Sequence, residues 1–455
     1  MEKKELREVA ERAKEEQYTY LNRKCFSSLL KASENLAFRQ YDDTVCLLYD
    51  VFEFCWKSLR HLVCHDVQTL KQHLPTRNMW NSFMPRLKGL VILDQEYREL
   101  LETFGACNPR WVDNPQERLN ARYGVRSFDE QQAELMMRQA ELLARILAKA
   151  QRRLAFQQDS LNVGILSGYF GRDVSAEKTC DQAPWGDYEE AGVEGWAKAL
   201  VERSRSRLAI SKIPITQMDA RYLVVVNPFG ETYPELPSTA GILPGFQMIR
   251  DYIYSGGAFV TAGGHPFSYL FDVMKGTAYD TSTLIRDIPV SITATPSQDG
   301  KINLNVLRTT LAVKTLLQQH FGVETTWDEP AKNQEGPVLC EVFQNQGDDK
   351  YWNSGPAKLP PLNEFRSFES AHGGHPVGVL RATRLGVKEV YPIGFVRYGF
   401  GLLLHIGLAL NKGRRTEFNV AADAVSKGLL ERLQSYTGGD DEGPLDASDL
   451  HAIHR

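Results

Sequence analysis

The first third of the chain has the apolar spacing of amphipathic helices. Through YDDTVCLLYDVFEFCWKSLRHLV (41–63), apolar residues recur every three or four positions and form one stripe, made of Leu48, Val51, Phe52, Cys55, Leu59 and Leu62. This spacing is typical of a helix that buries one face. Similar patterns run through 3–30, 90–104 and 127–156, where glycine is rare. The pattern predicts an all-α bundle of about four or five helices.

Near Gln157 the pattern changes to short apolar runs that end in glycine turns. These runs predict strands, and they read LNVGILSG, RLAISKIPI, RYLVVVNPFG, GGAFVTAGG and FGLLLHIGLAL. Helical segments at 194–205 and 247–255 separate some of them, and a further helix is predicted at 304–321. Strand-helix alternation predicts a flavodoxin-like α/β sandwich with a mainly parallel sheet. The strands expected in 377–410 are partly antiparallel.

The predicted organisation is therefore a helical bundle at 1–157, an α/β domain at 160–415, and a C-terminal helix with an acidic tail at 416–455. The tail is polar and is expected to be disordered. A formal net charge of -4 gives no general attraction to nucleic acid or to membranes. There is no run of about 18 apolar residues and no signal-peptide core, so we expect a cytoplasmic protein without a membrane partner.

The seven cysteines are scattered, and no two of them form a CxxC pair. That excludes the usual zinc spacings and argues against a disulfide framework. We expect the cysteines to pack in the core and expect no metal or cofactor.

The turns that end the predicted parallel strands are the first candidate site. SGYFG, NPFGETYPE and AGGHPFSY all follow strands, and ligands of open parallel sheets bind beyond the carboxyl ends of the strands. Backbone N–H groups at such glycine turns can meet an anion or a carbonyl oxygen, and a helix expected to start at Pro266 would add its own. The candidate ligand-binding residues are Gly168, Glu231, Gly263, Gly264 and His265. Because a Glu231 carboxylate repels phosphates, the expected ligand is small and neutral or zwitterionic. The alternative is that the glycines only shape tight turns and that the two titratable side chains are solvated.

The order of these parts resembles the class I glutamine amidotransferase-like fold, including its ThuA-like members, over about residues 160–412. Active amidotransferases of this group carry a cysteine at the strand-to-helix elbow and a His-x-Glu pair late in the domain. This sequence has Gly263 and Gly264 at the elbow and no His-x-Glu. A glutaminase needs a thiolate for the acyl-enzyme, so the resemblance implies a binding domain without glutaminase activity.

Residues 15–155 resemble a HEPN domain in the long helix at 41–63 and in RLNARYGV followed by the helix from Phe128. Many HEPN proteins are metal-independent ribonucleases with an Arg-x4–6-His motif. RHLVCH fits this motif and makes Arg60, His61 and His65 the candidate catalytic residues, with arginine holding the phosphate and histidine moving the 2′-hydroxyl proton. The alternative is a solvated Arg60 at a helix end, with His65 as a C-terminal cap. RSFESAH, from Arg366 to His372, also fits the Arg-x4–6-His motif, outside the helical region.

Three hypotheses about function follow. The first is an RNA-binding or RNA-cleaving effector of defence or stress, regulated by an inactive amidotransferase-like sensor. The second is a non-enzymatic scaffold or sensor within a complex. The third is a ThuA-like hydrolase that uses His265, Glu231 or His372, for which no nucleophile-base-orienter set is visible. A homodimer through the helical part is also expected, because Phe52, Phe54 and Trp56 spread around one helix.

Overall fold

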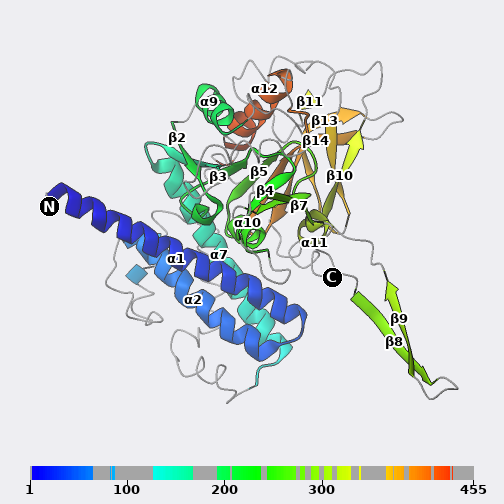
Figure 1. The fold of residues 1–455 in the computed structure, drawn as a ribbon. Helices are drawn as coiled ribbons and strands as arrows, with labels where there is room; N and C mark the ends of the chain where they lie inside the picture. The colour runs from blue at the N-terminus through cyan, green and yellow to red at the C-terminus, as the bar shows by residue number, and fades with distance from the viewer. Residues whose placement is uncertain are drawn as a thin grey trace.

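The computed structural model describes residues 3–64, 82–83, 85–87, 127–167, 192–204, 207–236, 243–272, 277–281, 288–296, 302–309, 315–328, 338–339, 365–371, 373–383, 389–410, 415–430 and 433. Helices come first, and strands alternate with helices afterwards (Figure 1). The predicted fold class, a helical region followed by a mainly parallel α/β sandwich, is confirmed. The helix predicted at 90–104 and the tail at 434–455 lie outside the described residues.

Among the described residues, the helical part contains three long helices, α1 (Lys3–Ala37), α2 (Tyr41–Cys64) and α7 (Glu130–Gln157), which pack against one another (Figure 1). Five of the six residues in the predicted stripe of α2 are buried as its spacing requires, and Leu62, near the end of the helix, is partly buried. Phe52 and Trp56 lie inside the same core, and Phe54 packs against it. Packing within one chain therefore uses the aromatic residues on which the expected homodimer rested.

Five strands form the parallel half of an eight-stranded sheet, in the order β15-β5-β3-β1-β2. Their bounds are β1 Leu161–Leu166, β2 Leu208–Ile213, β3 Val224–Asn227, β5 Ala258–Ala262 and β15 Gly401–Ile406. These are the glycine-bounded apolar runs of the sequence, and their residues are largely buried, as strands covered on both faces should be. The order in which later strands are added outward from β1 is that of flavodoxin-like folds.

Antiparallel strands extend the sheet beyond β15. They are β14 (Glu389–Tyr398), β13 (Val377–Thr383) and β11 (Val338–Leu339). Smaller sheets pair β10 (Val323–Asp328) with β12 (Phe365–Ser370), β8 (Ile288–Pro296) with β9 (Ile302–Thr309), and β4 (Thr232–Glu235) with β6 (Tyr269–Asp272) and β7 (Thr277–Asp280).

Helices cover the parallel strands. The first, α9 (Val193–Arg203), packs on β1 and β2 and contacts α12 (Arg415–Asp423), which continues into a π-helical segment, Ala424–Leu430. The second, α10 (Pro244–Tyr254), packs on β5 and β15 and contacts α1 of the helical part. The predicted helices at 194–205 and 247–255 correspond to α9 and α10.

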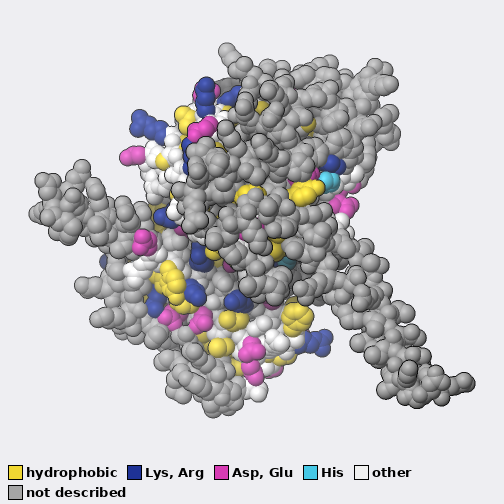
Figure 2. Space-filling model, in the orientation of Figure 1, with side chains coloured by type: hydrophobic (Ala, Val, Ile, Leu, Met, Phe, Trp, Pro, Cys, Tyr) yellow, Lys and Arg dark blue, Asp and Glu magenta, His cyan; other side chains and the backbone are white. Residues whose placement is uncertain are grey.

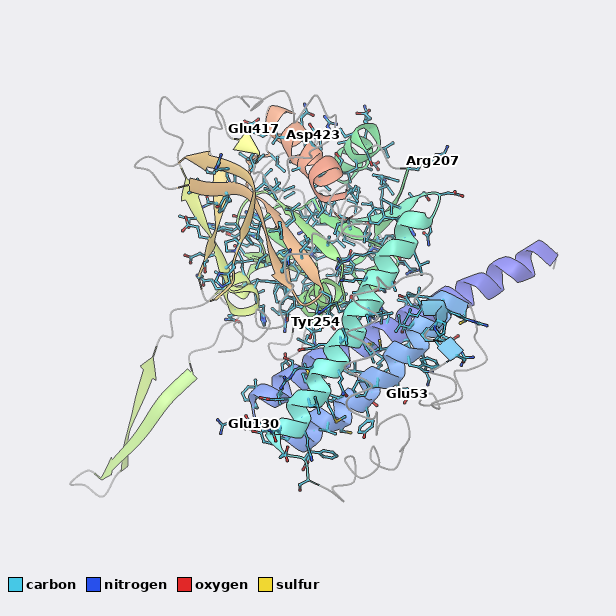
Figure 3. All side chains as sticks on the ribbon, turned by 180° about the vertical axis from the view of Figure 1, so that it is seen from behind. Glu53, Glu130, Arg207, Tyr254, Glu417 and Asp423 are labelled. Atoms are coloured by element: carbon cyan, nitrogen blue, oxygen red, sulfur yellow. The ribbon has the colours of Figure 1, made fainter. Side chains whose placement is uncertain are left out.

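The helical part packs directly on the sheet. Only residues 158–160 separate α7 from β1. Phe26 of α1 lies 5.5 Å from Phe400, ring centre to ring centre, and Arg250 of α10 reaches Glu34 of α1 at 3.6 Å. Tyr254, which contacts the Phe400 ring edge-on, lies at this junction (Figure 3). The two parts therefore share one continuous apolar core.

Two predicted helices are wrong. The turn at Gly263 leads into strand β6 and not into a helix, because residues 269–272 pair with β4 on one side and β7 on the other. The first part of the helix predicted at 304–321, residues 304–309, belongs to strand β9 (Ile302–Thr309). The helix α11 (Leu316–Phe321) begins only after Thr315, whose side chain forms a capping box with Gln318.

Candidate functional site

The glycine turn after β5 brings together four of the predicted ligand-binding residues. Gly263 and Gly264 have φ angles of +90° and +57°, in the left-handed region that favours glycine. The Glu231 side chain, which is buried, accepts a hydrogen bond from the backbone N–H of His265 at 2.6 Å. A Cβ on Gly264 would stand 2.1 Å from Glu231 Cγ. The strand end is therefore not bare: Glu231 covers it with its own carboxylate. Gly168 lies outside the described residues.

Aromatic packing anchors the chain directly after this turn. Phe267 also has a positive φ, +64°, which is unusual for a residue with a bulky side chain. Its ring is buried and stacks on Phe321 at 6.1 Å, and its carbonyl accepts the Thr281 hydroxyl at 2.9 Å. Tertiary packing thus holds a backbone conformation that no local preference of Phe267 supplies.

Two histidines lie near the carboxyl ends of the central strands. His265 Nδ1 contacts Thr325 Oγ1 of β10, and His405 Nδ1 of β15 lies 3.2 Å from Thr261 Oγ1 of β5. Burial, together with the positive charge of Arg366, lowers the pKa of His265 to about 4. Burial, together with repulsion from His265 and Arg366, lowers the pKa of His405 to about 3. Both imidazoles are therefore neutral near pH 7.

His405 was missed by the sequence analysis, although a polar residue inside the apolar run FGLLLHIG was a usable signal. Its side chain is fully buried, and its Nε2 has no hydrogen-bond partner among the described residues. The described groups here are neutral imidazoles, threonine hydroxyls and one carboxylate bound to a backbone N–H. They do not assemble a nucleophile with a base and an orienting group. His372 lies outside the described residues.

Arg60 and His61, the two described residues of the arginine–histidine motif, contact different parts of the helical region. The Arg60 guanidinium lies 5.8 Å from the centre of the Trp56 ring on its own helix. His61 stacks on Tyr18 of α1, with ring centroids 5.5 Å apart and planes inclined by 17°. His65 lies outside the described residues. On the face shown in Figure 2, basic and acidic side chains are interspersed over the described surface of the helices.

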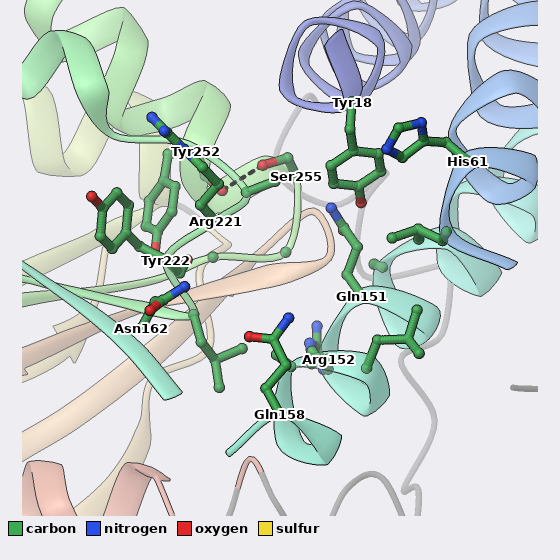
Figure 4. Close-up of a pocket in the computed structure, with 18 residues that line it drawn as sticks. Tyr18, His61, Gln151, Arg152, Gln158, Asn162, Arg221, Tyr222, Tyr252 and Ser255 are labelled. Atoms are coloured by element: carbon green, nitrogen blue, oxygen red, sulfur yellow. Dashed lines mark hydrogen bonds between the residues drawn. The ribbon is translucent and has the colours of Figure 1, made fainter. Parts of the chain in front are cut away.

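A pocket of about 570 Å³ lies between the helical part and the sheet (Figure 4). The lining residues of the helical part include Tyr18, His61, Gln151, Arg152 and Gln158. The lining residues of the α/β part include Asn162, Arg221, Tyr222, Tyr252 and Ser255. Asn162 belongs to the start of β1, and the pocket residues Leu223 and Gly257 directly precede β3 and β5. The pocket therefore lies at the amino ends of the strands, opposite the edge that the sequence predicted.

Several polar groups at this junction form no hydrogen bond of good geometry with the part of the chain that the structure describes. Tyr18 Oη and Gln151 Nε2 are buried and find no partner of good geometry among the described residues. Burial raises the pKa of Tyr18 well above its ordinary value, although the nearby amides of Gln151 and Asn22 oppose the shift. The Arg152 guanidinium donates to the Phe400 carbonyl. Buried polar groups normally have a partner, so groups without one point to an absent ligand or water.

A smaller pocket of about 200 Å³ adjoins the first and shares Ala220, Tyr252 and Ser255 with it. Thr19 Oγ1 and Asn22 Nδ2 line it and also lack partners among the described residues. We call the two pockets together the junction pocket.

No protein-family model matches the chain, and no curated protein matches its sequence. Distantly similar solved structures include a cold-adapted β-galactosidase from Rahnella sp. R3, at 13% identity and a TM-score of 0.33 over 65% of this chain and 35% of that one. The cytoplasmic protein STM1381 from Salmonella typhimurium LT2 gives 10% identity and a TM-score of 0.30 over 61% of this chain and 99% of that one. The match covers about a third of the length of the β-galactosidases. Likeness at this level carries no inference about activity.

The described helices include none long and apolar enough to span a membrane. Within the described ranges, no group of three or more histidine, cysteine, aspartate or glutamate side chains is arranged to hold a metal ion. The class that the fold and site define is a helical region on a flavodoxin-like α/β sheet, with a polar pocket at their junction.

Proposed function

We propose that this protein is a ligand-responsive sensor that binds a small molecule in the junction pocket. One observation carries the proposal: buried polar groups without partners cluster where the helices and the sheet meet. Residues of both parts line the pocket, so a ligand there would contact both. Such a ligand favours the arrangement of the two parts that offers it more contacts.

The glycine elbow is consistent with a binding role for the α/β part. Gly263 and Gly264 stand at the elbow where the amidotransferases that the sequence resembles carry a cysteine, and the Glu231 carboxylate covers this turn. Binding of a neutral or zwitterionic ligand at this edge stays a prediction, and such a ligand would have to displace Glu231 from the His265 amide. The junction pocket offers volume without that displacement.

Thermal shift of the full chain against a metabolite panel tests the sensor proposal. In the Gln158→Trp variant an indole would fill the pocket from an exposed position at the end of α7, so the fold should survive. Gln131→Trp, exposed near the other end of α7, is the matched control. A ligand that stabilises the wild type and Gln131→Trp, but not Gln158→Trp, supports the proposal. A panel without any such ligand contradicts it.

As a second candidate we propose HEPN-type RNA binding or cleavage by the helical part, as a homodimer, with the pocket as its regulatory site. The observation that favours it is the place of His61, which lines the junction pocket beside Tyr18. Incubation with single-stranded RNA in EDTA, using the wild type, Arg60→Ala, His61→Ala and His65→Ala, tests it. Cleavage lost in the variants supports it, and an inert wild type contradicts cleavage. Light scattering tests the dimer.

A further inference from the structure

The charge of the larger compartment of the junction pocket is one-sided. Its 18 lining residues include Arg152, Arg221 and His61, and no aspartate or glutamate is among them. Arg221 is held by Asp219, with Nη2 to Oδ2 at 2.7 Å, so its position is fixed. Arg152 donates to a neutral carbonyl of Phe400. Asp219 offsets the charge of Arg221, and Asp219 and Asp251 line the smaller compartment. In the larger compartment a ligand meets the Arg152 guanidinium and no lining carboxylate, which favours an anion on that side of the junction pocket.

The groups without partners are mainly hydrogen-bond donors. Tyr18 Oη lies close to the Gln151 and Asn22 amides but forms no hydrogen bond of good geometry with them. Gln151 and Tyr18 line the larger compartment, and Asn22 lines the smaller one, so their N–H and O–H groups are available to a ligand. Donors of this kind need acceptors, and a phosphate group presents three or more acceptor oxygens. The hydrogen-bonding groups of the pocket and the charge of its larger compartment thus favour the same kind of ligand, an anion with several acceptor oxygens.

Aromatic rings form two walls of the larger compartment. Tyr18 and His61 stand on the helical side, while Tyr222 and Tyr252 stand on the side of the sheet, with the Gln151, Arg152 and Gln158 side chains between the two sides (Figure 4). Aromatic walls favour a planar ring, and side-chain amides can read the polar edge of such a ring.

We propose that the junction pocket binds a mononucleotide, with its phosphate near Arg152 and its base against the aromatic walls. The inference rests on the proposed sensor function and names the chemical class of its ligand. A volume of about 570 Å³ lies within the range of sites that enclose ligands of this size.

Calorimetric titration of the full chain with AMP, GMP, CMP and UMP tests the inference, with adenosine, inorganic phosphate and a short single-stranded RNA as separate arms. Arg152→Gln removes the charge near the phosphate. Because Arg152 also bonds to Phe400, Gln151→Met serves as a second variant, which removes the side-chain amide at similar volume and changes no charge. Arg138→Gln, exposed on the same helix, is the matched control for lost charge.

We expect at least one mononucleotide to bind about tenfold or more tightly than its nucleoside or phosphate alone. Arg152→Gln and Gln151→Met should each weaken it about tenfold, with Arg138→Gln unchanged. Nucleotide binding that the pocket variants leave intact overturns the inference, and so does RNA binding that no mononucleotide competes with. If a different metabolite stabilises the chain in a Gln158-dependent way, the sensor proposal stands and the nucleotide inference fails. If nothing binds there, both fail.

Discussion

Glu231 Oε1 accepts the backbone N–H of His265 at 2.6 Å, and the Glu231 side chain lies directly over Gly264. The carboxylate thus covers the glycine turn that follows β5. Gly264 is glycine for two physical reasons, its φ of +57° and the lack of room for a Cβ beside Glu231.

We predict that Gly264→Ala destabilises the protein by about 2 kcal/mol or more. The left-handed backbone costs an alanine about 1 kcal/mol, and the contact with Glu231 adds to it. Urea unfolding measures the change. In a Glu231→Ala background the cost of Gly264→Ala should fall to about 1 kcal/mol, because only the backbone term remains. Equal costs in the two backgrounds would show that Glu231 does not occupy this position.

His405 should make the fold sensitive to acid. Its folded pKa of about 3 lies below the ordinary value of 6.5, so the unfolded chain takes up a proton between these values that the folded chain does not. Stability from this group is present above pH 6.5 and is lost as the pH falls toward 3, by up to about 1.4 kcal/mol per pH unit. Unfolding free energies between pH 6.5 and 4.5 should therefore fall less steeply in His405→Gln.

The control for the loss of an imidazole is His375→Gln, at an exposed position. A wild-type slope in His405→Gln would contradict this prediction.

Glu141 should make the fold less stable as the pH rises, which is the opposite of the effect of His405. Burial raises its pKa to about 7 from 4.5, against the opposing charges of Arg145 and Arg138. The folded chain holds a proton that the unfolded chain loses between pH 4.5 and 7, so stability is lost as the pH rises through that range. Glu141→Gln stays neutral at every pH, so its free energy of unfolding at pH 8 should exceed that of the wild type by up to roughly 3 kcal/mol. Below pH 4.5 the two free energies of unfolding should become similar. Glu134→Gln, exposed on the same helix, is the control. If the free energies of unfolding of Glu141→Gln and the wild type change in parallel with pH, the predicted protonation of Glu141 in the fold is wrong.

Arg250 should stabilise the packing of the helical part on the sheet through its polar contacts. It is largely buried, reaches Glu34 at 3.6 Å, and donates from Nη2 to the Tyr398 hydroxyl at 2.8 Å. Arg250→Met should cost about 2 kcal/mol, because a buried acceptor and a carboxylate both lose their donor. Lys198→Met, which breaks an exposed pair with Glu202, should change stability by less than about 0.5 kcal/mol. Thermal and urea unfolding compare the two, and equal losses would contradict this role of Arg250.

Local sequence patterns determined the elements and their class. The stripe of α2 and the glycine-bounded runs of the parallel strands could be predicted because helix and strand periods act between near neighbours. The same reasoning failed at INLNVLRT, where short apolar spacing fits a helix or a strand equally well and pairing with β8 selects the strand. It failed again after Gly263, where pairing with β4 and β7 selects β6 over a helix.

Only the tertiary structure decided the sites. Glu231 meets His265 across 34 positions of sequence, and His405 meets Thr261 across 144. The junction pocket joins Tyr18, Gln151 and Tyr252, which no repeat or motif links, because it arises where the helical part docks on the amino ends of the strands. Docking is set by the shape and burial of whole faces, as in the contact of Phe26 with Phe400. The sequence by itself therefore determined which segments form helices and strands, and long-range packing determined which polar groups were left facing a cavity without partners.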